Sequence, residues 1–500
     1  MLRVLLYAVV LFNSLSALRA EFSSSADDAF IRDDSNRVRF FHGVNMVHKS
    51  FPWYSDVLLD TDNIKDLQKW GLNALRLGVM WTGTEPNKGE YNETYLDIVT
   101  GIIDNLQSHG VHVLIDVHQD VLSSYFCEYD GAPTWLVDMS TSSEHEFPWP
   151  LPGTCSDRPW GSNYLAEATG AAFQDIYDNN NGMMDHFAAF WRKVADTFKG
   201  KDLLGYEIIN EPWAGNIYSN PSLLLPGVAG SINLQPMYDT ISSAIRSVDE
   251  AHLIFYEPVT WGMIFNGTVS GSGFSHVPGG DTYTRKSVLS FHYYCWWYDS
   301  TGAFDRVTCD AMFGPKVFDQ CREDVSQLGG SYMLTEWGQG CDPTTPEGSL
   351  ECNAVMDLAD SHLTSWIDWY WGEHLEGSGF DATDEAVAVF SRTYAQAVAG
   401  TPTRMRFDTT DASFELCFVL DTGINTPTEV YVNTEIHYPD GVMVSIFGAD
   451  AALLDSSVDI HDNLVKVFIK SEVRDDRNEY VFVSSGENTC VHIVNKRSPN

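Results

Sequence analysis

Between residues 37 and 404, short apolar runs alternate with longer stretches in which apolar residues recur at helical spacing. The stretches with helical spacing include residues 63–70, 95–108, 185–198, 237–248 and 352–363. The apolar runs occupy residues 40–47, 74–81, 112–117, 203–209, 252–256, 288–294, 332–337 and 365–371. Strands that alternate with helices form right-handed parallel units, and eight such units close into a barrel. The pattern therefore predicts a (β/α)8 TIM barrel over residues 37–404.

From residue 405 the pattern changes to short alternating runs rich in Val, Tyr and Phe, with turn-forming residues between them. These runs lie at residues 414–419, 429–437, 442–447, 465–469, 480–483 and 490–494. Strands of this kind are typical of two packed antiparallel sheets. Residues 405–500 are therefore predicted to form a small β-sandwich domain.

The residues before the barrel divide into two parts. Residues 1–20 contain Arg3, an apolar run over 4–12 and small residues up to Ala20, which is the pattern of a secretory signal peptide. Residues 21–36 are polar and acidic and are expected to form a flexible lead-in. No later stretch reaches about 18 consecutive apolar residues, so no membrane span is expected. We therefore expect a secreted protein, extracellular or in a digestive lumen, with a lysosomal location as the alternative.

The chain is strongly acidic, with a net charge of −39 at pH 7. This charge argues against nucleic acid or an anionic membrane as an electrostatic partner. It suits a secreted protein or one that works in an acidic compartment, and we expect an activity optimum below neutral pH. Two glycosylation sequons, at Asn92 and Asn266, are consistent with a secreted glycoprotein.

Cysteine usage also fits secretion, since an oxidising compartment permits disulfides. The chain has nine cysteines, so at least one is unpaired within the monomer. The expected pairs, chosen because each lies within one local unit, are Cys341–Cys352 and Cys417–Cys490. The sequence contains no CxxC or HExxH motif, and we expect neither a metal nor any other cofactor.

Two apolar runs end in a carboxylate. The fourth run leads into Asn210-Glu211-Pro212, and Pro212 cannot continue a central strand, so Glu211 is predicted at the tip of that strand. The seventh run leads into Glu336, followed by Trp337 and a glycine. Taken alone, either carboxylate could be a solvated loop residue. Together, at the end of the barrel where active sites lie, they are the pair that glycoside hydrolysis requires.

Two long connections follow the third and fourth predicted strands, over residues 118–184 and 211–236. They are rich in Trp, Pro, Gly and Ser, and loops of this length shape a binding cleft or are insertions without function. Residues 221–230 form an apolar stretch inside the second connection. This stretch is predicted either to pack as a short helix or to contact lipid.

Several stretches resemble a known family. The two carboxylate motifs resemble the signature of family 5 glycoside hydrolases, which carry a catalytic Glu on the fourth and seventh barrel strands. Further stretches are similar to the endoglycoceramidase branch of that family. They are GVNMVHK (43–49), NALRLGVMW (73–81), LIDVHQD (114–120), GAPTW (131–135) and RTYAQAVAGTP (392–402). Thr393 stands where branch members often carry Pro, a departure at a structural junction and not at the chemistry.

The resemblance implies that Glu211 is the general acid/base and Glu336 the nucleophile of a retaining reaction, with carboxyl groups about 5–5.5 Å apart. Arg76 lies within the second predicted strand, where a buried charge requires a partner. Glu336 is its natural partner, and Arg76 would keep that carboxylate ionised, unless Arg76 forms a structural ion pair elsewhere. Asn210 could donate a hydrogen bond to the sugar 2-hydroxyl.

The end of the sixth strand offers two further polar groups. His292 could orient the acid/base, and the Tyr294 hydroxyl could bond to Glu336; the alternative for each is a satisfied core residue. The remaining candidates are expected to contact sugar, with Trp371, or alternatively Trp369, as the floor of the sugar subsite. These sugar contacts are Lys49, Asp116, His118, Asp120 and Trp371, of which the three from the third strand share one face if the strand extends that far.

The resemblance implies a secreted endo-β-glycosidase that cleaves the bond between oligosaccharide and ceramide with retention. Its partner would be a glycosphingolipid, with transient contact to a lipid micelle or membrane surface. The candidate lipid-side residues are Trp213, residues 223–225, Trp296 and Trp297. The alternatives are another β-glycosidase on the same scaffold, such as a steryl-β-glucosidase or an endoglucanase, and a non-catalytic lectin-like glycoprotein.

Overall fold

The computed structural model describes residues 21–25, 27–127, 129–261, 264–265, 268–294, 297, 305–371, 383–471 and 484–496. The predicted signal peptide lies outside these residues. Within them, no helix has the length and apolar character needed to cross a membrane.

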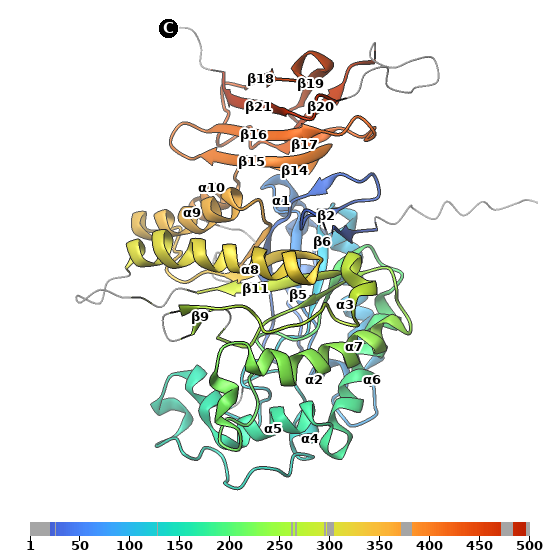
Figure 1. The fold of residues 1–500 in the computed structure, drawn as a ribbon, viewed down its shortest axis with the longest axis vertical. Coiled ribbons are helices and arrows are strands. Elements are labelled where there is room, and N and C mark those ends of the chain that lie inside the picture. Colours follow the sequence, from blue (N-terminus) through green and yellow to red (C-terminus); the bar gives the residue numbers. More distant parts are fainter. Residues whose placement is uncertain are drawn as a thin grey trace, which may run out of the picture.

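Eight parallel strands close into a barrel, which confirms the predicted TIM barrel (Figure 1). The strands are β4 (His42–Met46), β5 (Ala74–Gly78), β6 (His112–Asp116), β7 (Leu203–Glu207), β8 (Leu253–Tyr256), β11 (Ser287–Tyr293), β12 (Ser331–Trp337) and β13 (Trp366–Asp368). Each corresponds to one apolar run of the sequence. The fully buried patterns of strands such as β5 and β12 are what a parallel sheet covered on both faces requires.

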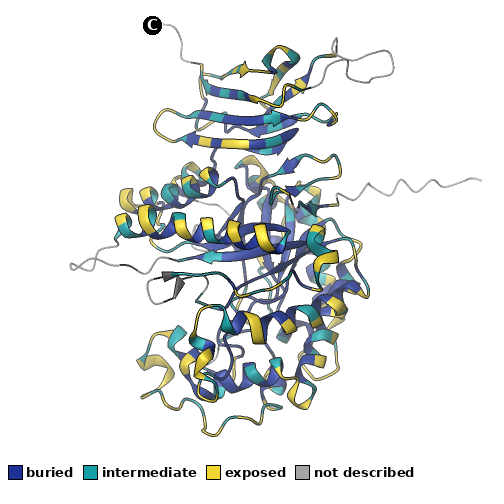
Figure 2. Cartoon of the chain, in the orientation of Figure 1, coloured by how far each residue is buried: buried dark blue, intermediate teal, exposed yellow. Residues whose placement is uncertain are grey.

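Helices cover the outside of the barrel and also lie in the long connections between its strands. The longer ones are α1 (Thr61–Lys69), α3 (Glu93–Ser108), α5 (Glu167–Tyr177), α6 (Met183–Phe198), α7 (Gln235–Arg246), α8 (Gly314–Leu328) and α9 (Pro346–Ser361). Short helices α2 (Trp81–Thr84), α4 (Thr134–Val137) and α10 (Asp384–Phe390) lie in connections. Each long helix buries one apolar face; in α6 that face includes Phe187, Trp191 and Val194. Figure 2 shows the same division between buried and exposed faces along these helices.

Two antiparallel sheets form a separate β-domain, which confirms the predicted change of architecture. One sheet has the order β1-β2-β3-β14-β17-β20-β19 and the other β15-β16-β21-β18. Their C-terminal strands are β14 (Tyr394–Val398), β15 (Gly400–Asp408), β16 (Ser413–Leu420), β17 (Thr428–Tyr431), β18 (Val442–Gly448), β19 (Leu454–Asp459), β20 (Leu464–Ile469) and β21 (Asn488–Asn495). Side chains from both sheets, including Phe418 and Val430, share one apolar core.

The predicted flexible lead-in is wrong for its described part. Residues Ser23–Ser24 (β1), Ile31–Arg32 (β2) and Val38–Arg39 (β3) form the edge of the larger β-domain sheet. Apolar residues between the acidic ones explain the difference, because Phe22, Ile31 and Val38 are buried. The β-domain also begins earlier than residue 405, since β14 starts at Tyr394.

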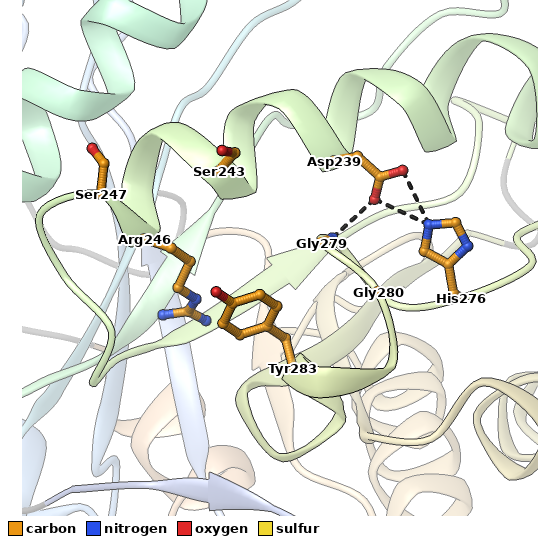
Figure 3. Close-up of a pocket in the computed structure, with 8 residues that line it drawn as sticks. All are labelled: Asp239, Ser243, Arg246, Ser247, His276, Gly279, Gly280 and Tyr283. Atoms are coloured by element: carbon orange, nitrogen blue, oxygen red, sulfur yellow. Dashed lines mark hydrogen bonds and ion pairs between the residues drawn. The ribbon is translucent and has the colours of Figure 1, made fainter.

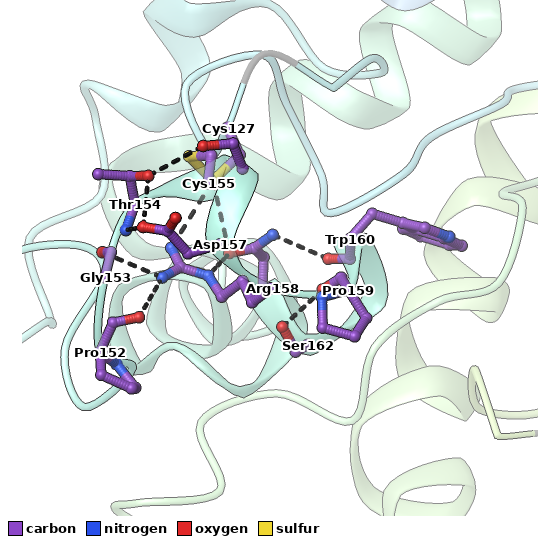
Figure 4. Close-up of a disulfide and its surroundings, with 12 residues drawn as sticks. Cys127, Pro152, Gly153, Thr154, Cys155, Asp157, Arg158, Pro159, Trp160 and Ser162 are labelled. Atoms are coloured by element: carbon purple, nitrogen blue, oxygen red, sulfur yellow. Dashed lines mark hydrogen bonds between the residues drawn. A yellow bond between two sulfur atoms is a disulfide. The ribbon is translucent and has the colours of Figure 1, made fainter.

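Both predicted disulfides, Cys341–Cys352 and Cys417–Cys490, are present. Cys309 is also disulfide-bonded, and Cys321 is a buried free thiol, as the odd number of cysteines requires. A further bond, Cys127–Cys155, was not predicted because it joins residues 28 apart within one long connection. Beside it, Arg158 donates to Asn163 and to the carbonyl oxygen of Pro152, which fixes this part of the loop (Figure 4).

The β-domain packs against the amino-terminal end of the barrel. The hydroxyl groups of Tyr394 and Tyr431 donate to the carbonyl oxygens of Gly71 and Lys69, in the turn that precedes strand β5. At the junction, Thr393 bonds to the hydroxyl of Tyr438 at 2.9 Å. The long connection that carries α4 and α5 lies at the opposite end of the molecule (Figure 1). The carboxyl-terminal ends of the barrel strands therefore face away from the β-domain.

Candidate active site

Arg76, on β5, lies at the centre of the polar cluster inside the barrel and is completely buried. Its Nη1 donates to Glu336 Oε2 at 3.1 Å and to Asn45 Oδ1 at 3.0 Å. Its Nη2 donates to Asn210 Oδ1 at 2.8 Å. The predicted pairing of Arg76 with Glu336 is therefore present, and the same guanidinium also holds the residue before Glu211.

Three more carboxylates face the same guanidinium. Glu207, at the end of β7, pairs with Nε, while Asp116 Oδ1 lies 3.1 Å and Glu257 Oε1 3.6 Å from Nη2. Burial opposes the charge on Arg76, but the carboxylates of Asp116, Glu207 and Glu336 outweigh that cost and raise the pKa of Arg76 well above the ordinary value. Arg76 is therefore a fixed positive charge beneath the site.

Glu336 lies on β12 and is held by two donors. Besides Arg76, the Tyr294 hydroxyl donates to Glu336 Oε1 at 2.7 Å, as predicted. Burial raises the pKa of Glu336, and the positive charge of Arg76 opposes that rise. With a donor on each oxygen, Glu336 is the better stabilised of the two predicted catalytic carboxylates in its ionised form.

Glu211 lies just beyond β7 with its backbone in the left-handed region, at φ +40°. A non-glycine residue rarely adopts this conformation, so its surroundings must hold it there. The carbonyl oxygen of Glu211 accepts from Gln119 Nε2 at 2.9 Å and from Thr260 Oγ1 at 2.8 Å. These contacts direct the carboxyl group of Glu211 toward His292, whose Nδ1 lies 3.0 Å from Glu211 Oε1.

The environment of Glu211 favours the protonated form. Burial, followed by the negative charge of Asp120, raises its pKa to about 7. A carboxylic acid that keeps its proton near neutral pH can act as a general acid.

The two glutamates meet at His292. The parallel register of β11 and β12 sets His292 beside Glu336. One ligand atom from each of Glu211, His292 and Glu336 lies within 4.8 Å of the other two. Similar spacing joins His118, Asp120 and Asp130. The atoms of each group are close enough together to bind a cation. However, Arg76 already pairs with Glu336 in the first group, and Lys49 with Asp120 in the second.

A second polar group lies beside the glutamates. Lys49 forms an ion pair with Asp120, and its Nζ lies 4.7 Å from the centre of the Trp369 ring. The Trp369 ring also stacks on His118, with ring centres 5.1 Å apart. Burial lowers the pKa of His118, but Asp116 and Asp120 outweigh it and raise that pKa to about 9. The structure thus gathers most of the predicted sugar contacts on one side of the site.

Two predicted sugar contacts are wrong. Asp116 is completely buried between Arg76 and the Nδ1 of His118, which lies 2.8 Å from its Oδ2. Strand β6 ends at Asp116, so it does not share an open face with the residues that follow. Trp371 is buried in the core against Trp70. The alternative, Trp369, takes the place at the site because β13 ends at Asp368.

Sequence reasoning missed four buried polar residues of this site: Asn45, Gln119, Glu207 and Glu257. Glu207 carried a signal, since it is the one charged residue in the apolar run 203–209. Glu257 carried another, because Glu257-Pro258 repeats at the fifth strand the pattern of Glu211-Pro212 at the fourth.

The candidate lipid-side residues differ in exposure. Trp213 is buried between the rings of Tyr164 and Trp261. Leu223 is buried as well, as the packed-helix alternative predicted, whereas Leu225 is exposed. Trp297 is exposed and stacks on Phe313. Trp296 lies outside the described residues.

A separate surface pocket of about 560 Å³ lies on the outer wall of the barrel, between α7 and the segment before β11 (Figure 3). Its charged groups already have partners. Arg246 donates to the carbonyl oxygen of His252 at 2.7 Å and lies over the ring of Tyr283, and Asp239 pairs with His276 at 3.0 Å. We therefore assign these groups to holding α7 in place.

A closed barrel with one glutamate just beyond the fourth strand and a second near the end of the seventh defines a barrel glycoside hydrolase. Comparison with known proteins identifies the family. Residues 33–375 match the cellulase family, glycosyl hydrolase family 5, and residues 392–479 match the glycoside hydrolase family 5 C-terminal domain. The chain belongs to glycoside hydrolase family 5.

Individual relatives cover most of the chain. It is 38% identical over 453 residues to the endoglycoceramidase of Cyanea nozakii, covering 84% of this chain and 86% of that protein. It is 36% identical over 477 residues to the endoglycoceramidase of Hydra vulgaris, covering 89% and 87%. The fold is similar to that of endo-glycoceramidase II from Rhodococcus sp., with a TM-score of 0.73, 22% identity, and coverage of 94% of this chain and 100% of that one.

Proposed function

We propose that this glycosidase hydrolyses the β-glycosidic bond between oligosaccharide and ceramide in glycosphingolipids, with retention of configuration. The observation that carries the mechanism is the cluster of Glu211, His292 and Glu336, whose facing atoms lie within 4.8 Å of one another. Retaining enzymes need carboxyls about 5–5.5 Å apart, whereas inverting enzymes leave room for a water between them. The substrate class is supported by the relatives from Cyanea nozakii and Hydra vulgaris, both endoglycoceramidases.

In the first step, a carboxylate oxygen of Glu336 attacks the anomeric carbon while Glu211 gives its proton to the leaving ceramide oxygen. A covalent glycosyl-enzyme forms and ceramide departs. In the second step, Glu211 takes a proton from water, the water oxygen bonds to the anomeric carbon, and the bond to Glu336 breaks. The free oligosaccharide leaves with its original configuration, and both glutamates return to their starting states.

The neighbours of Glu336 and Glu211 support this division of roles. Arg76 and the Tyr294 hydroxyl stabilise Glu336 as a carboxylate, the form that attacks and later departs. The Asn210 amide donates one N–H to the carbonyl oxygen of Gln119 at 3.1 Å, and its second N–H is assigned to the sugar 2-hydroxyl.

The polar side of the site is assigned to sugar. Lys49, His118 and Asp120 offer donors and acceptors for hydroxyl groups, and the Trp369 ring offers an apolar face to a sugar ring. Because neighbouring residues already hold these charged side chains in place, little side-chain entropy is lost when they bind a sugar.

The ceramide side is assigned to the long connections after β6 and β7. These connections expose several large apolar side chains, which we call the apolar rim: Tyr125, Trp149, Trp160, Leu165, Tyr218 and Leu225. Some of them touch, since the rings of Trp149 and Tyr218 lie 5.3 Å apart. Aromatic side chains are favoured where lipid meets water. We infer that the apolar rim contacts the surface of a zwitterionic membrane or micelle, because a net charge of −39 disfavours an anionic one.

The predicted signal peptide and the disulfides support secretion. We propose that the enzyme acts outside the cytosol, in an extracellular, digestive or lysosomal compartment.

The test is an identification of products by mass spectrometry after incubation with a ganglioside and, separately, with a soluble β-glucan. We expect intact oligosaccharide and ceramide from the ganglioside and no glucan cleavage. Glu211→Gln and Glu336→Gln should each lower activity by at least about 100-fold, since each removes a group that acts in the transition state. Glucan cleavage with the ganglioside untouched would reject the proposed substrate while leaving the two glutamates in their roles.

A further inference from the structure

Two buried polar atoms face each other beneath the acid/base. His292 Nε2 and Glu257 Oε1 lie 3.4 Å apart, and neither has another hydrogen-bond partner among the described residues. The two side chains are 7% and 3% exposed. A buried donor or acceptor without a partner is destabilising, so two such atoms in contact form a hydrogen bond after a small adjustment.

Glu257 also contacts Glu211 directly. Its Oε2 accepts the backbone N–H of Glu211 at 3.2 Å, at the residue whose φ is +40°. The main chain of Glu257 is held in turn by Tyr238, whose hydroxyl donates to the carbonyl oxygen at 2.8 Å and accepts the N–H at 3.1 Å. Glu257 therefore touches both the backbone of the acid/base and the histidine that faces its carboxyl group.

The charges around His292 require one of the buried carboxyls to be neutral. The titratable and charged groups that face it are Arg76 on β5, Asp116 on β6, Glu207 and Glu211 from β7, Glu257 after β8, Glu336 on β12 and the neighbouring Tyr294. One arginine cannot balance so many carboxylates in a low dielectric. Burial, followed by the charge of Glu207, raises the pKa of Glu257 well above its ordinary value. Burial also lowers the pKa of His292, which favours a neutral imidazole.

We propose that Glu257 is a positioning residue that holds a proton and donates it as a hydrogen bond to His292 Nε2. This donation fixes the neutral imidazole with its hydrogen on Nδ1, and Nδ1–H then donates to Glu211 Oε1. The acid proton of Glu211 is thereby placed on Oε2, the oxygen left to face the leaving group. The inference rests on the proposed role of Glu211 as the acid/base.

The proton balance of the reaction is unchanged by this arrangement. Glu211 gives its Oε2 proton to the leaving oxygen in the first step and regains one from water in the second. Glu257 and His292 keep their protons throughout. Their contribution is a constant hydrogen bond to Oε1, which stabilises the Glu211 carboxylate formed after the first step.

The test compares Glu257→Gln with Glu257→Leu in the pH profile of kcat/KM. Gln keeps a neutral donor to Nε2 and an acceptor for the Glu211 N–H, so its profile should stay within about threefold of wild type. Leu removes the donor, and kcat/KM on a ganglioside should fall by about 10- to 100-fold, part of what general acid catalysis supplies. Its basic limb should move to higher pH, because the Glu211 carboxylate loses a stabilising hydrogen bond.

A second substrate distinguishes a loss of Glu211 positioning from general damage to the structure. This substrate, such as a dinitrophenyl β-lactoside, has a leaving group that needs no protonation. On this substrate, the decrease in kcat/KM caused by Glu257→Leu should be only a few-fold. The control is Glu351→Leu, which removes a buried carboxyl on α9 that pairs with Arg306 away from the site. Equal losses in the Gln and Leu variants, or an equal loss on both substrates, would overturn the proposal.

If Glu257→Leu does not fold, the proposal can be tested on the wild-type enzyme instead. Nitrogen-15 spectra of histidine-labelled protein, with the His292 signals assigned by their absence in His292→Asn, report which ring nitrogen carries hydrogen. Hydrogen on Nδ1 supports the proposal, and hydrogen on Nε2 rejects it. Failure of the proposed function would appear differently, as a wild-type enzyme without glycosidase activity on either substrate.

Discussion

Glu336 is buried and Glu211 is half-buried, and their polar neighbours also differ. Glu336 receives donors on both oxygens, from Arg76 and Tyr294. Glu211 has His292 on one oxygen and the negative charge of Asp120 nearby. Two carboxyl groups with opposed environments are the usual means by which one site holds an acid and a nucleophile at the same pH.

This difference predicts how activity depends on pH. The proposed acid Glu211 must be protonated, and its pKa is raised to about 7, so kcat/KM should fall as pH rises through about 7. The nucleophile must be ionised, and its pKa is raised by burial, so activity should also fall in acid. An optimum between these limits lies below neutral pH. The measurement is the pH profile of kcat/KM on a glycosphingolipid.

The variant Asp120→Asn tests whether the pKa of Glu211 sets the basic limb of this pH profile. Removing the negative charge near Glu211 should lower the pKa of Glu211 and move the basic limb to lower pH. Asp408→Asn, a change on β15 of the β-domain, is the control and should leave the limb in place. A basic limb above pH 8 in the wild type, or one that does not respond to Asp120→Asn, would contradict this reading of the site.

At the scale of elements, apolar runs predicted the barrel because a strand covered on both faces must be apolar throughout. The same runs did not reveal where each strand ends. Strand β13 stops at Asp368, so Trp369 and not Trp371 reaches the site. Strand β6 stops at Asp116, which leaves that carboxylate beneath the site. Within a strand, side chains alternate between the two faces, so the sequence pattern predicts their direction. Past the end of the strand this alternation stops, and the pattern no longer predicts which side chain points into the site.

The long connections after β6 and β7 are predicted to bind a lipid surface through the apolar rim. Trp149 and Trp160 are 41% and 47% exposed on the apolar rim, and Phe447 is 47% exposed on β18 of the β-domain. The Trp149→Ala/Trp160→Ala double variant should bind phosphatidylcholine vesicles that contain ganglioside about tenfold more weakly, for a loss of roughly 1–2 kcal/mol of apolar burial. Phe447→Ala is the matched control and should bind as wild type does. The measurement is vesicle co-sedimentation.

Kinetics on two substrates complete that test. The double variant should show a raised KM on vesicle-bound ganglioside and an unchanged kcat/KM on a soluble aryl lactoside. Vesicle binding equal to wild type would contradict a role of the apolar rim at a membrane, and an equal loss on the soluble substrate would indicate damage to the site.

At the scale of the whole molecule, the β-domain covers one end of the barrel, and the proposed active site lies at the opposite end (Figure 1). Arg392, completely buried at their junction, pairs with Asp360 at 3.1 Å and with Asp357. The acidic lead-in joins the same domain through β1, β2 and β3. These contacts between distant segments could not be predicted, because local pattern carries no information about them.

The proposed catalytic pair, Glu211 and Glu336, could be predicted from the sequence for a different reason. Glu211 follows a buried strand and Glu336 lies near the end of one, and a parallel barrel brings such strand ends together whatever their separation along the chain. Their assigned roles came from family resemblance. The sequence gives only weak signals for the residues around them, above all Glu207 and Glu257, because it is the fold that gathers carboxyl groups from four strand ends around Arg76.

The most direct test of the two-glutamate mechanism is covalent trapping with a 2-deoxy-2-fluoro-β-lactosyl fluoride, whose fluorine slows both steps and whose fluoride leaves without protonation. The proposed mechanism predicts a mass increase of one fluorolactosyl group, located by peptide mapping on Glu336, and release of the group on incubation with an acceptor. A label on Glu211 or another residue, or a first product of inverted configuration by proton NMR with no label formed, would contradict it.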